Sequence, residues 1–366
     1  MDVKQINQQT SAFLKINLAA IRHNWFSLHR NFVGTTTECA AVLKADAYGL
    51  GMEEVARALR DHVKTFFVAH PEEGKRLRSL LPSQRIFILH GFLPNQIDDI
   101  VRYNLVPVLN SYAQVKQWQN FCKVHGCRHP VALQFDSGMS RFGLSEEDLD
   151  REALSSCQPV LVMSHLACAD HPNDASNEWQ RQNFIRMAQR FPGVPRSLAA
   201  SSGIFLGSKY HFDLVRPGAA LYGIAPNEET PHSLKPVVEL DARILQIRHL
   251  TKGASVGYGL TWEAKHAARI ATVGIGYADG FLRSAGNKAA LWWRDKRLPV
   301  VGRVSMDSLS VDISTIPEAA LTDDMSLSVI GPHQDVDALA RASGTIGYEI
   351  LTSLGSRFSR IYCDNE

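Results

Sequence analysis

The feature that most constrains the fold is an alternation between residues 37 and 216, where short runs rich in β-branched and aromatic residues are separated by amphipathic stretches. The amphipathic stretches include helical patterns at residues 52–63, 72–81, 113–124 and 177–190. Such alternation is typical of β-α units around a parallel sheet. The candidate strands are 39–43, 65–68, 85–89, 105–108, 131–135, 160–164, 197–200 and 212–215. Eight units predict a TIM-like (β/α)8 barrel, with a doubly wound sheet as the alternative.

The pattern changes after residues 226–236. Strand-like runs then follow one another with turn residues between them, at 237–250, 268–275, 290–293, 298–313 and 326–330. This spacing predicts a mainly antiparallel β domain, followed by a helix over 336–341 that ends at Gly344 and a last segment over 348–362. We therefore expect a barrel domain over residues 10–230 and a β domain over 231–366, on which residues 1–9 can pack.

Composition excludes several classes of protein. The chain has 39 Lys and Arg against 37 Asp and Glu, and this balance provides no basic field for nucleic acid. No apolar run approaches the ~20 residues that span a bilayer, and the N-terminus lacks the apolar core of a signal peptide. We expect a cytoplasmic protein that binds neither nucleic acid nor membranes.

The cysteines indicate free thiols rather than a disulfide framework. There are six of them without any C-x-x-C pair, which is too few for a framework in 366 residues. A cluster of Cys122, His125, Cys127 and His129 has the wrong spacings for paired zinc ligands. The sequence predicts no metal site.

The first candidate strand runs directly into a lysine, in Val42-Leu43-Lys44-Ala45-Asp46-Ala47-Tyr48. In a barrel, the carboxyl ends of the strands form the catalytic rim. A lysine that is partly desolvated there can attack a carbonyl and hold it as a Schiff base. On position alone, a surface lysine at a strand end remains the alternative.

This lysine segment resembles the pyridoxal-phosphate motif of the alanine racemase family. Further segments resemble the family's motifs in the family's order, so the resemblance covers nearly the whole chain. They are residues 135–143, 163–167, 201–203, 215–218, 256–262, 276–280 and 302–307.

The resemblance implies a pyridoxal 5'-phosphate enzyme with two bases. Racemisation removes an α proton on one face and returns one on the other, so bases on both faces are the simplest arrangement. By resemblance, Lys44 is one base and Tyr258 is the other. A tyrosine titrates near pH ~10, so it needs neighbours that lower its pKa, and the resemblance assigns this role to His165 and Arg216.

The resemblance also assigns the residues that hold the cofactor phosphate. They are a serine hydroxyl, the Tyr48 hydroxyl and the backbone around Gly218 and Ala219, with Ser201 favoured over Ser202 as the serine. Independently of the resemblance, the loops after the seventh and eighth barrel strands commonly bind phosphate. By resemblance, Arg216 faces the pyridine nitrogen, to which an arginine can donate a hydrogen bond without transferring its proton.

Substrate recognition is assigned by resemblance to Arg141, Tyr277 and Met306. Arg141 would also contact the phenolic oxygen of the cofactor, a role that suits a planar cation with several donors. Tyr258, Tyr277 and Met306 lie in the expected β domain. In the family a head-to-tail homodimer brings these residues to the barrel of the partner, so the resemblance implies shared active sites.

Two positions depart from the family pattern. Many relatives carry a lysine seven residues before the arginine, where it is carbamylated and braces that arginine, but this chain has Gln134. Many relatives also have a tyrosine that reaches the phosphate where this chain has Ser356. A carbamate cannot form on Gln134, and the phosphate contact of Ser356 is lost or taken over by Tyr48.

Together these features favour an isomerase that interconverts L- and D-alanine and supplies D-alanine for peptidoglycan. A racemase of broader specificity, acting on serine, is an alternative on the same scaffold. A decarboxylase with the same two-domain plan is a further rival, but a base at Tyr258 is not expected there. A non-catalytic pyridoxal-phosphate protein would have no need of the β domain.

Overall fold

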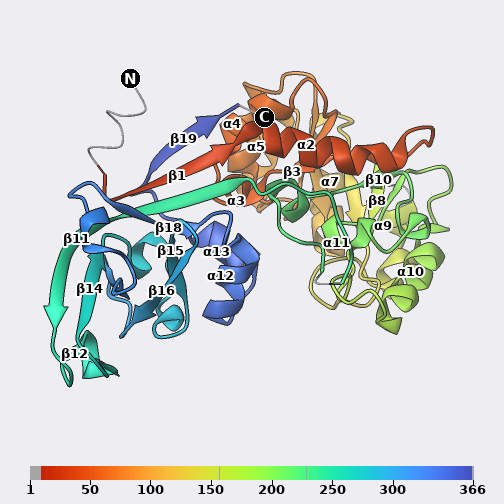
Figure 1. The fold of residues 1–366 in the computed structure, drawn as a ribbon. Coiled ribbons are helices and arrows are strands. Elements are labelled where there is room, and N and C mark those ends of the chain that lie inside the picture. Colours follow the sequence, from red (N-terminus) through yellow and green to blue (C-terminus); the bar gives the residue numbers. More distant parts are fainter. Residues whose placement is uncertain (1–9, 156, 228, 365–366) are drawn as a thin grey trace. The chain divides into compact units, whose positions relative to one another are not determined.

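The computed structural model describes residues 10–155, 157–227 and 229–364. The chain forms two compact units (Figure 1). One unit runs from Ile21 to Lys235, and the other combines the N-terminal segment up to Ala20 with the chain from Pro236 onward. The expected packing of residues 1–9 lies outside the described residues.

The first unit, called here the barrel unit, is built on a parallel sheet. Seven strands pair in chain order from β3 to β9, and β10 pairs in parallel with β2. The strands are β2 (Glu38–Cys39), β3 (Ala41–Val42), β4 (Thr65–Val68), β5 (Arg85–Ile88), β6 (Val106–Leu109), β7 (Ala132–Gln134), β8 (Leu161–Met163), β9 (Arg196–Ser197) and β10 (Leu214–Val215).

Backbone hydrogen bonds close this sheet into a ring. The Arg216 N–H donates to Ala199 O at 2.9 Å, which joins the segment after β10 to the segment after β9. The Ala40 and Val42 N–H groups donate to Val215 O and Pro217 O, which joins the eighth strand position to the first. The expected (β/α)8 barrel is confirmed, and the open doubly wound alternative is wrong because its edge strands would not pair.

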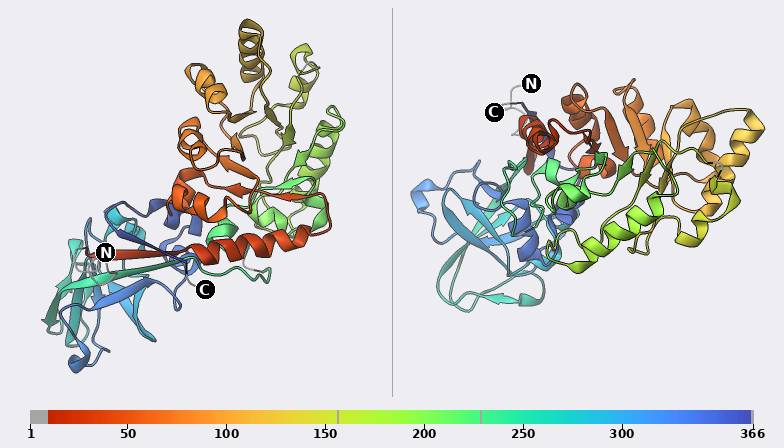
Figure 2. Two further views of the ribbon diagram at one scale, coloured as in Figure 1. Left: turned by 90° about the horizontal axis from the view of Figure 1, so that it is seen from above. Right: turned by 90° about the vertical axis from the view of Figure 1, so that its right-hand side faces the viewer.

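Helices follow the strands and lie outside them (Figure 2). Their apolar faces cover the sheet, as in α4, where Val55, Ala56 and Leu59 are buried. The helices are α2 (Leu18–His29), which links the two units, and α3 (Lys44–Tyr48), α4 (Met52–Leu59), α5 (Pro71–Arg78), α6 (Ile97–Arg102), α7 (Tyr112–His125), α8 (Glu146–Leu149), α9 (Glu152–Ser155), α10 (Ala175–Ala188) and α11 (Ser201–Ile204).

The second unit, called here the β unit, is a mostly antiparallel barrel. Its strand order is β14-β17-β16-β15-β18-β11-β1-β19, and β14 also pairs with β11. Bulges near Asp241 and Ile244 bend the long strand β11, so that it pairs with β18 and then with β14. The strands are β1 (Ala12–Asn17), β11 (Val238–Leu250), β12 (Ser255–Val256), β13 (Trp262–Glu263), β14 (Ala268–Val273), β15 (Ala290–Trp293), β16 (Lys296–Val301), β17 (Leu309–Asp312), β18 (Ser326–Ile330) and β19 (Ser359–Cys363).

The ends of the chain meet in the β unit. Strand β1 pairs with β11 and with β19, although the expected boundary at residue 10 placed this segment with the barrel. The expected helix forms as α12 (Val336–Ser343), and Gly344 ends it with a φ of 74°, which glycine adopts without steric cost. Helix α13 (Gly347–Ser353) precedes β19.

All six cysteines lie among the described residues and are free thiols, as expected. Within the described part of the chain, no helix is both long enough and apolar enough to cross a membrane.

Candidate active site

Lys44 directly follows the first barrel strand and begins an unusual turn. The next four residues, Ala45 to Tyr48, have φ angles between 54° and 57°, in the left-handed region. Such a conformation costs about 1–2 kcal/mol for each residue with a side chain. None of these four is a glycine, so the surrounding structure has to maintain the strain, as happens at functional sites.

The environment of Lys44 favours its neutral amine. Burial lowers the pKa of Lys44, and the charges of Arg141 and Arg216 lower it further, while the Glu73 carboxylate opposes them. A lowered pKa increases the fraction of unprotonated amine near neutral pH. The neutral amine is the form that attacks a carbonyl carbon.

Tyr48, Ser201 and Gly218 form a cradle at the ends of three barrel segments. Ser201 Oγ accepts hydrogen bonds from the N–H groups of Gly218 at 3.0 Å and Ala220 at 3.1 Å. A Cβ atom on Gly218 would lie 2.4 Å from Tyr48 Oη, so only glycine fits there. Because Ser201 Oγ accepts both bonds, its proton remains available to donate to an anion. This donor chemistry fits the phosphate of the expected cofactor.

Arg216 is buried, with 4% of its surface exposed, at the end of the eighth strand position. Its guanidinium donates to Ser197 Oγ and, at 2.7 Å, to Ser164 O. Burial lowers the pKa of Arg216 to about 9, which still leaves it charged at neutral pH. A fixed cation therefore lies within the barrel rim.

His165 follows β8 and carries no charge at neutral pH. Burial lowers the pKa of His165 to about 3, helped by the charges of Arg216, Arg141 and Lys44. Of the two residues expected to lower the pKa of a tyrosine base, only Arg216 therefore brings charge. His165 can contribute only hydrogen bonds.

Arg141 lies in the loop after β7, and its side chain is exposed. Asp136 shapes this loop, because its Oδ1 accepts N–H bonds from Gly138, Met139 and Ser140 at 2.9–3.0 Å. Gln134, at the end of β7, is buried. A buried neutral amide therefore lies seven residues before Arg141.

The candidate residues of the β unit are exposed. The exposed fractions are 70% for Tyr258, 53% for Met306 and 41% for Tyr277. Tyr277 N–H donates to Ser305 O and Ala278 N–H donates to Met306 O, both at 3.0 Å, so the turns that carry Tyr277 and Met306 lie side by side. The structure thus brings these two residues together.

The turn that carries Tyr258 packs on the segment leading to Met306. A Cβ atom on Gly259 would lie 2.8 Å from Nη1 of Arg303. Ser356 is exposed in the loop between α13 and β19. The β unit therefore presents exposed tyrosine and methionine side chains on neighbouring turns.

Sequence reasoning missed two residues that support these segments. Glu73 on α5 accepts a hydrogen bond from Ala45 N–H at 2.7 Å, directly after Lys44. Arg357 donates to Asp279 at 2.7 Å and to Asp307 at 2.6 Å, and so bridges the turns that carry Tyr277 and Met306. Pro71 followed by two glutamates does signal a helix start, but no local pattern shows these long-range contacts.

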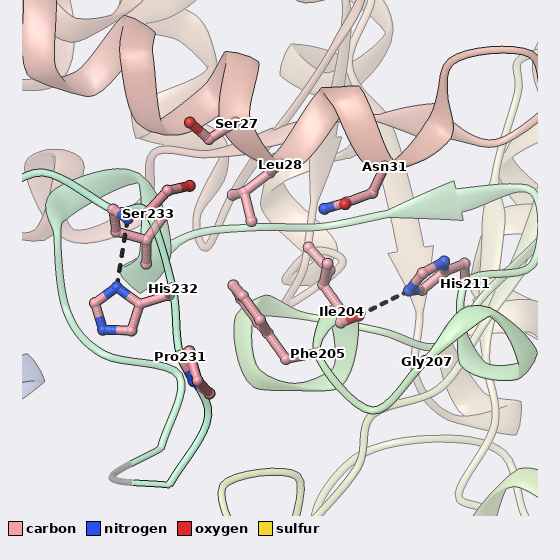
Figure 3. A pocket seen from close by; sticks show the side chains of 11 residues that line it. Ser27, Leu28, Asn31, Ile204, Phe205, Gly207, His211, Pro231, His232 and Ser233 are labelled. Atoms are coloured by element: carbon pink, nitrogen blue, oxygen red, sulfur yellow. Dashed lines mark hydrogen bonds between the residues drawn. The ribbon is translucent and has the colours of Figure 1, made fainter.

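A separate hollow of about 490 Å³ lies elsewhere on the barrel unit (Figure 3). It is lined by segments around Leu28, Phe205 and His232, and His211 there contacts Ile204 O at 2.8 Å. None of the candidate site residues lines it. The barrel residues predicted for the site therefore lie at the strand ends and not beside this hollow.

The barrel places Lys44, the cradle of Tyr48, Ser201 and Gly218, and the buried Arg216 at the carboxyl ends of its strands. This is the arrangement expected of a barrel-type pyridoxal-phosphate enzyme. The chain also matches the model of the alanine racemase N-terminal domain over residues 16–226 and that of the C-terminal domain over residues 237–362.

Individual relatives agree with the family models. The chain is 45% identical to an alanine racemase from Rhodospirillum rubrum, over 97% of this chain and 96% of the relative. It is 44% identical to one from Brucella ovis, over 95% and 93%. The crystal structure of alanine racemase from Bartonella henselae, with covalently bound pyridoxal phosphate, superimposes with a TM-score of 0.90 at 37% identity and covers 97% of this chain and all of that one.

The chain belongs to the alanine racemase family. It is a pyridoxal-phosphate-dependent isomerase with the barrel and β-barrel units of that family.

Proposed function

We propose that this enzyme interconverts L- and D-alanine, with Lys44 and Tyr258 as the two proton carriers. The observation that carries the proposal is Lys44 itself, which begins a strained turn beside the Tyr48, Ser201 and Gly218 cradle and has a lowered pKa. Bound pyridoxal phosphate supplies an electron sink that makes the α C–H bond of an attached amino acid acidic. The relatives named alanine racemase support alanine as the substrate.

Lys44 acts twice in this proposal. Its neutral Nζ would hold the cofactor covalently through the aldehyde carbon, with loss of water. Once the substrate amine takes that place, the freed Nζ could remove or return the α proton on its own face. Burial and the charges of Arg141 and Arg216 lower the pKa of Lys44, which favours the neutral amine that both tasks need.

Tyr48, Ser201, Gly218 and Ala219 hold the phosphate. The two hydroxyls would donate to phosphate oxygens, and the missing side chain at Gly218 leaves room for Tyr48 Oη beside its backbone. Arg216 donates a hydrogen bond to the pyridine nitrogen without transferring its proton. The electron sink is then weak, which suits an enzyme that only moves one α proton.

Tyr258 carries the proton on the opposite face. Because Tyr258 is 70% exposed in a single chain, a second surface has to cover it and exclude water before it can act on a bound substrate. We propose a head-to-tail homodimer in which the turns of Tyr258, Tyr277 and Met306 face the barrel rim of the partner. The exposed cluster of large side chains on neighbouring turns supports this arrangement.

The substrate carboxylate is bound by Arg141, with Tyr277 and Met306 limiting the space around the substrate side chain. An arginine provides the paired donors that a carboxylate requires. We place the reaction in the cytoplasm, where its D-alanine would supply peptidoglycan synthesis.

The test is a racemisation assay with L-alanine, D-alanine and L-serine on cofactor-saturated protein, followed by borohydride reduction and peptide mapping. We expect interconversion of both alanine isomers, slower turnover of serine and cofactor fixed on Lys44. Serine turnover equal to alanine turnover would favour the broader racemase. Fixed cofactor without any α-proton exchange would leave a binding protein and refute the proposal.

A further inference from the structure

The turn after Lys44 needs an interaction that maintains it. Ala45, Asp46, Ala47 and Tyr48 are all left-handed, although each carries a side chain that disfavours this conformation. Within the turn, the N–H of Gly49 bonds to Ala45 O at 2.8 Å. Such local bonds are available to right-handed turns as well, so they do not explain the hand of this one.

A carboxylate from a neighbouring helix contacts the beginning of the turn. Glu73 Oε1 accepts the Ala45 N–H at 2.7 Å, across 28 residues of sequence. Glu73 Oε2 accepts the N–H groups of Ala69 at 2.8 Å and His70 at 3.0 Å. One side chain therefore ties the first residue after Lys44 to the end of β4 and the start of α5.

This set of contacts exceeds what helix capping requires. A capping box on α5 needs only the bond between Glu73 and the His70 N–H. The bond to Ala45 uses the other oxygen and adds nothing to the helix. It fixes the peptide plane between Lys44 and Ala45, which includes the Cα of Lys44.

Glu73 also brings the one charge that opposes the lowered basicity of Lys44. Burial and the cations Arg141 and Arg216 lower the pKa of Lys44, and the Glu73 carboxylate raises it. The carboxylate is therefore close enough to act on the lysine as well as on the backbone. The hydrogen bond to the backbone beside Lys44 and the effect on the pKa of Lys44 both link Glu73 to this lysine.

We propose that Glu73 is a positioning residue that maintains the left-handed turn and thereby aims Lys44 Nζ at the aldehyde carbon of the cofactor. The inference rests on the proposed role of Lys44 as the covalent anchor. It predicts that Glu73 controls how fast Lys44 captures pyridoxal phosphate, and not only how stable helix α5 is.

The experiment compares Glu73→Gln and Glu73→Ala with the same changes at Glu72, which is exposed on α5 and bonds to Gln96 at 3.0 Å. Full-length apo-protein is mixed with pyridoxal phosphate, reduced with borohydride at timed intervals, and the Lys44 peptide is quantified. We expect capture to slow by roughly tenfold to 100-fold in Glu73→Ala. Glu73→Gln falls between, because one amide oxygen cannot serve both groups of donors, and the Glu72 variants match wild type.

A second variant separates the positioning of Lys44 by Glu73 from the capping of helix α5 by Glu73. Ala45→Gly removes the steric cost of the left-handed φ at a residue whose side chain is exposed. In the Glu73→Ala background it should restore a large part of the capture rate, and alone it should change little. Thermal unfolding of each variant reports the effect on folding.

Three outcomes are distinct. Normal capture in Glu73→Ala with a lowered melting temperature would make Glu73 only a helix cap and overturn the inference. Slow capture that Ala45→Gly fails to improve would also overturn the inference. Glu73 would then affect capture by some means other than the left-handed turn. No capture on Lys44 in wild type would refute the proposed function instead.

Discussion

The barrel unit and the β unit hold their candidate residues in opposite ways. In the barrel unit, Arg216 and Ser201 are at most 5% exposed, and the backbone after Lys44 is strained. In the β unit, Tyr258 and Met306 are more than half exposed on short turns. The barrel residues are thus held in place by their own unit, whereas those of the β unit project into water.

This difference shows what each unit can do alone. Buried donors with fixed partners are suited to hold a cofactor, because their geometry is set before it binds. Tyr258 and Met306, which are mostly exposed to water, need a second surface that excludes water before they can act on a substrate. We therefore expect the barrel unit to anchor the cofactor and the β unit to complete catalysis only when a second surface covers it.

The largest effect is expected for Lys44→Ala, because it removes the covalent anchor and one base together. Racemisation should fall by roughly 10⁴-fold or more in both directions. Lys64→Ala, at an exposed lysine before β4, is the matched control and should keep wild-type turnover. Turnover is measured by polarimetry. Near-normal turnover of the Lys44 variant would show that Lys44 of the barrel unit is neither the anchor nor a base.

Tyr258→Phe should separate the anchoring of the cofactor in the barrel unit from the proton transfer that needs the β unit. We expect borohydride to fix the cofactor on Lys44 as in wild type, while racemisation falls by roughly 10²–10⁴-fold. Tyr348→Phe changes another exposed tyrosine of the β unit and should have no effect. Loss of cofactor attachment in Tyr258→Phe would show that the barrel unit does not anchor the cofactor independently of Tyr258.

A smaller effect is expected for Arg357→Lys in the β unit. The lysine keeps the charge but cannot bond to Asp279 and Asp307 at once, so the turns of Tyr277 and Met306 should loosen. KM for alanine should rise about threefold to tenfold, with a smaller change in kcat. Arg297→Lys, at an exposed arginine on β16, controls for the substitution. Unchanged KM would assign Arg357 to folding alone.

No effect is expected from bicarbonate. A lysine at position 134 could be carbamylated, but the buried amide of Gln134 cannot react in this way. Turnover at fixed pH and ionic strength should therefore be the same with and without added bicarbonate. A reversible gain in rate would show that another group in the barrel unit takes up carbon dioxide.

The sequence predicts the barrel because each strand and helix has its own local pattern. The runs at 65–68, 290–293 and 326–330 form strands with those bounds. Contacts between distant residues were not predictable in this way. Strand β1 joins the β unit through its pairing with β11 and β19, and a single short apolar strand does not indicate its partner.

In the candidate site too, local patterns predict single residues but not the contacts between distant ones. Lys44 was predictable from its position after an apolar run and from the resemblance. The left-handed turn was not, because Ala45, Asp46 and Ala47 show none of the glycine signals that mark positive φ. Its contact with Glu73 depends on the packing of α5 on β4 and β5, which the tertiary fold decides.

The most direct test of the division between the units is to mix Lys44→Ala chains with Tyr258→Phe chains, after showing with mass-tagged chains that subunits exchange. Each variant alone should be inactive. If each site takes Lys44 from one chain and Tyr258 from the other, about half of the dimers are mixed, and each has one intact site. Activity should then rise toward about a quarter of wild type per site. Activity that stays at the level of the inactive parents, despite demonstrated exchange, would contradict the shared site.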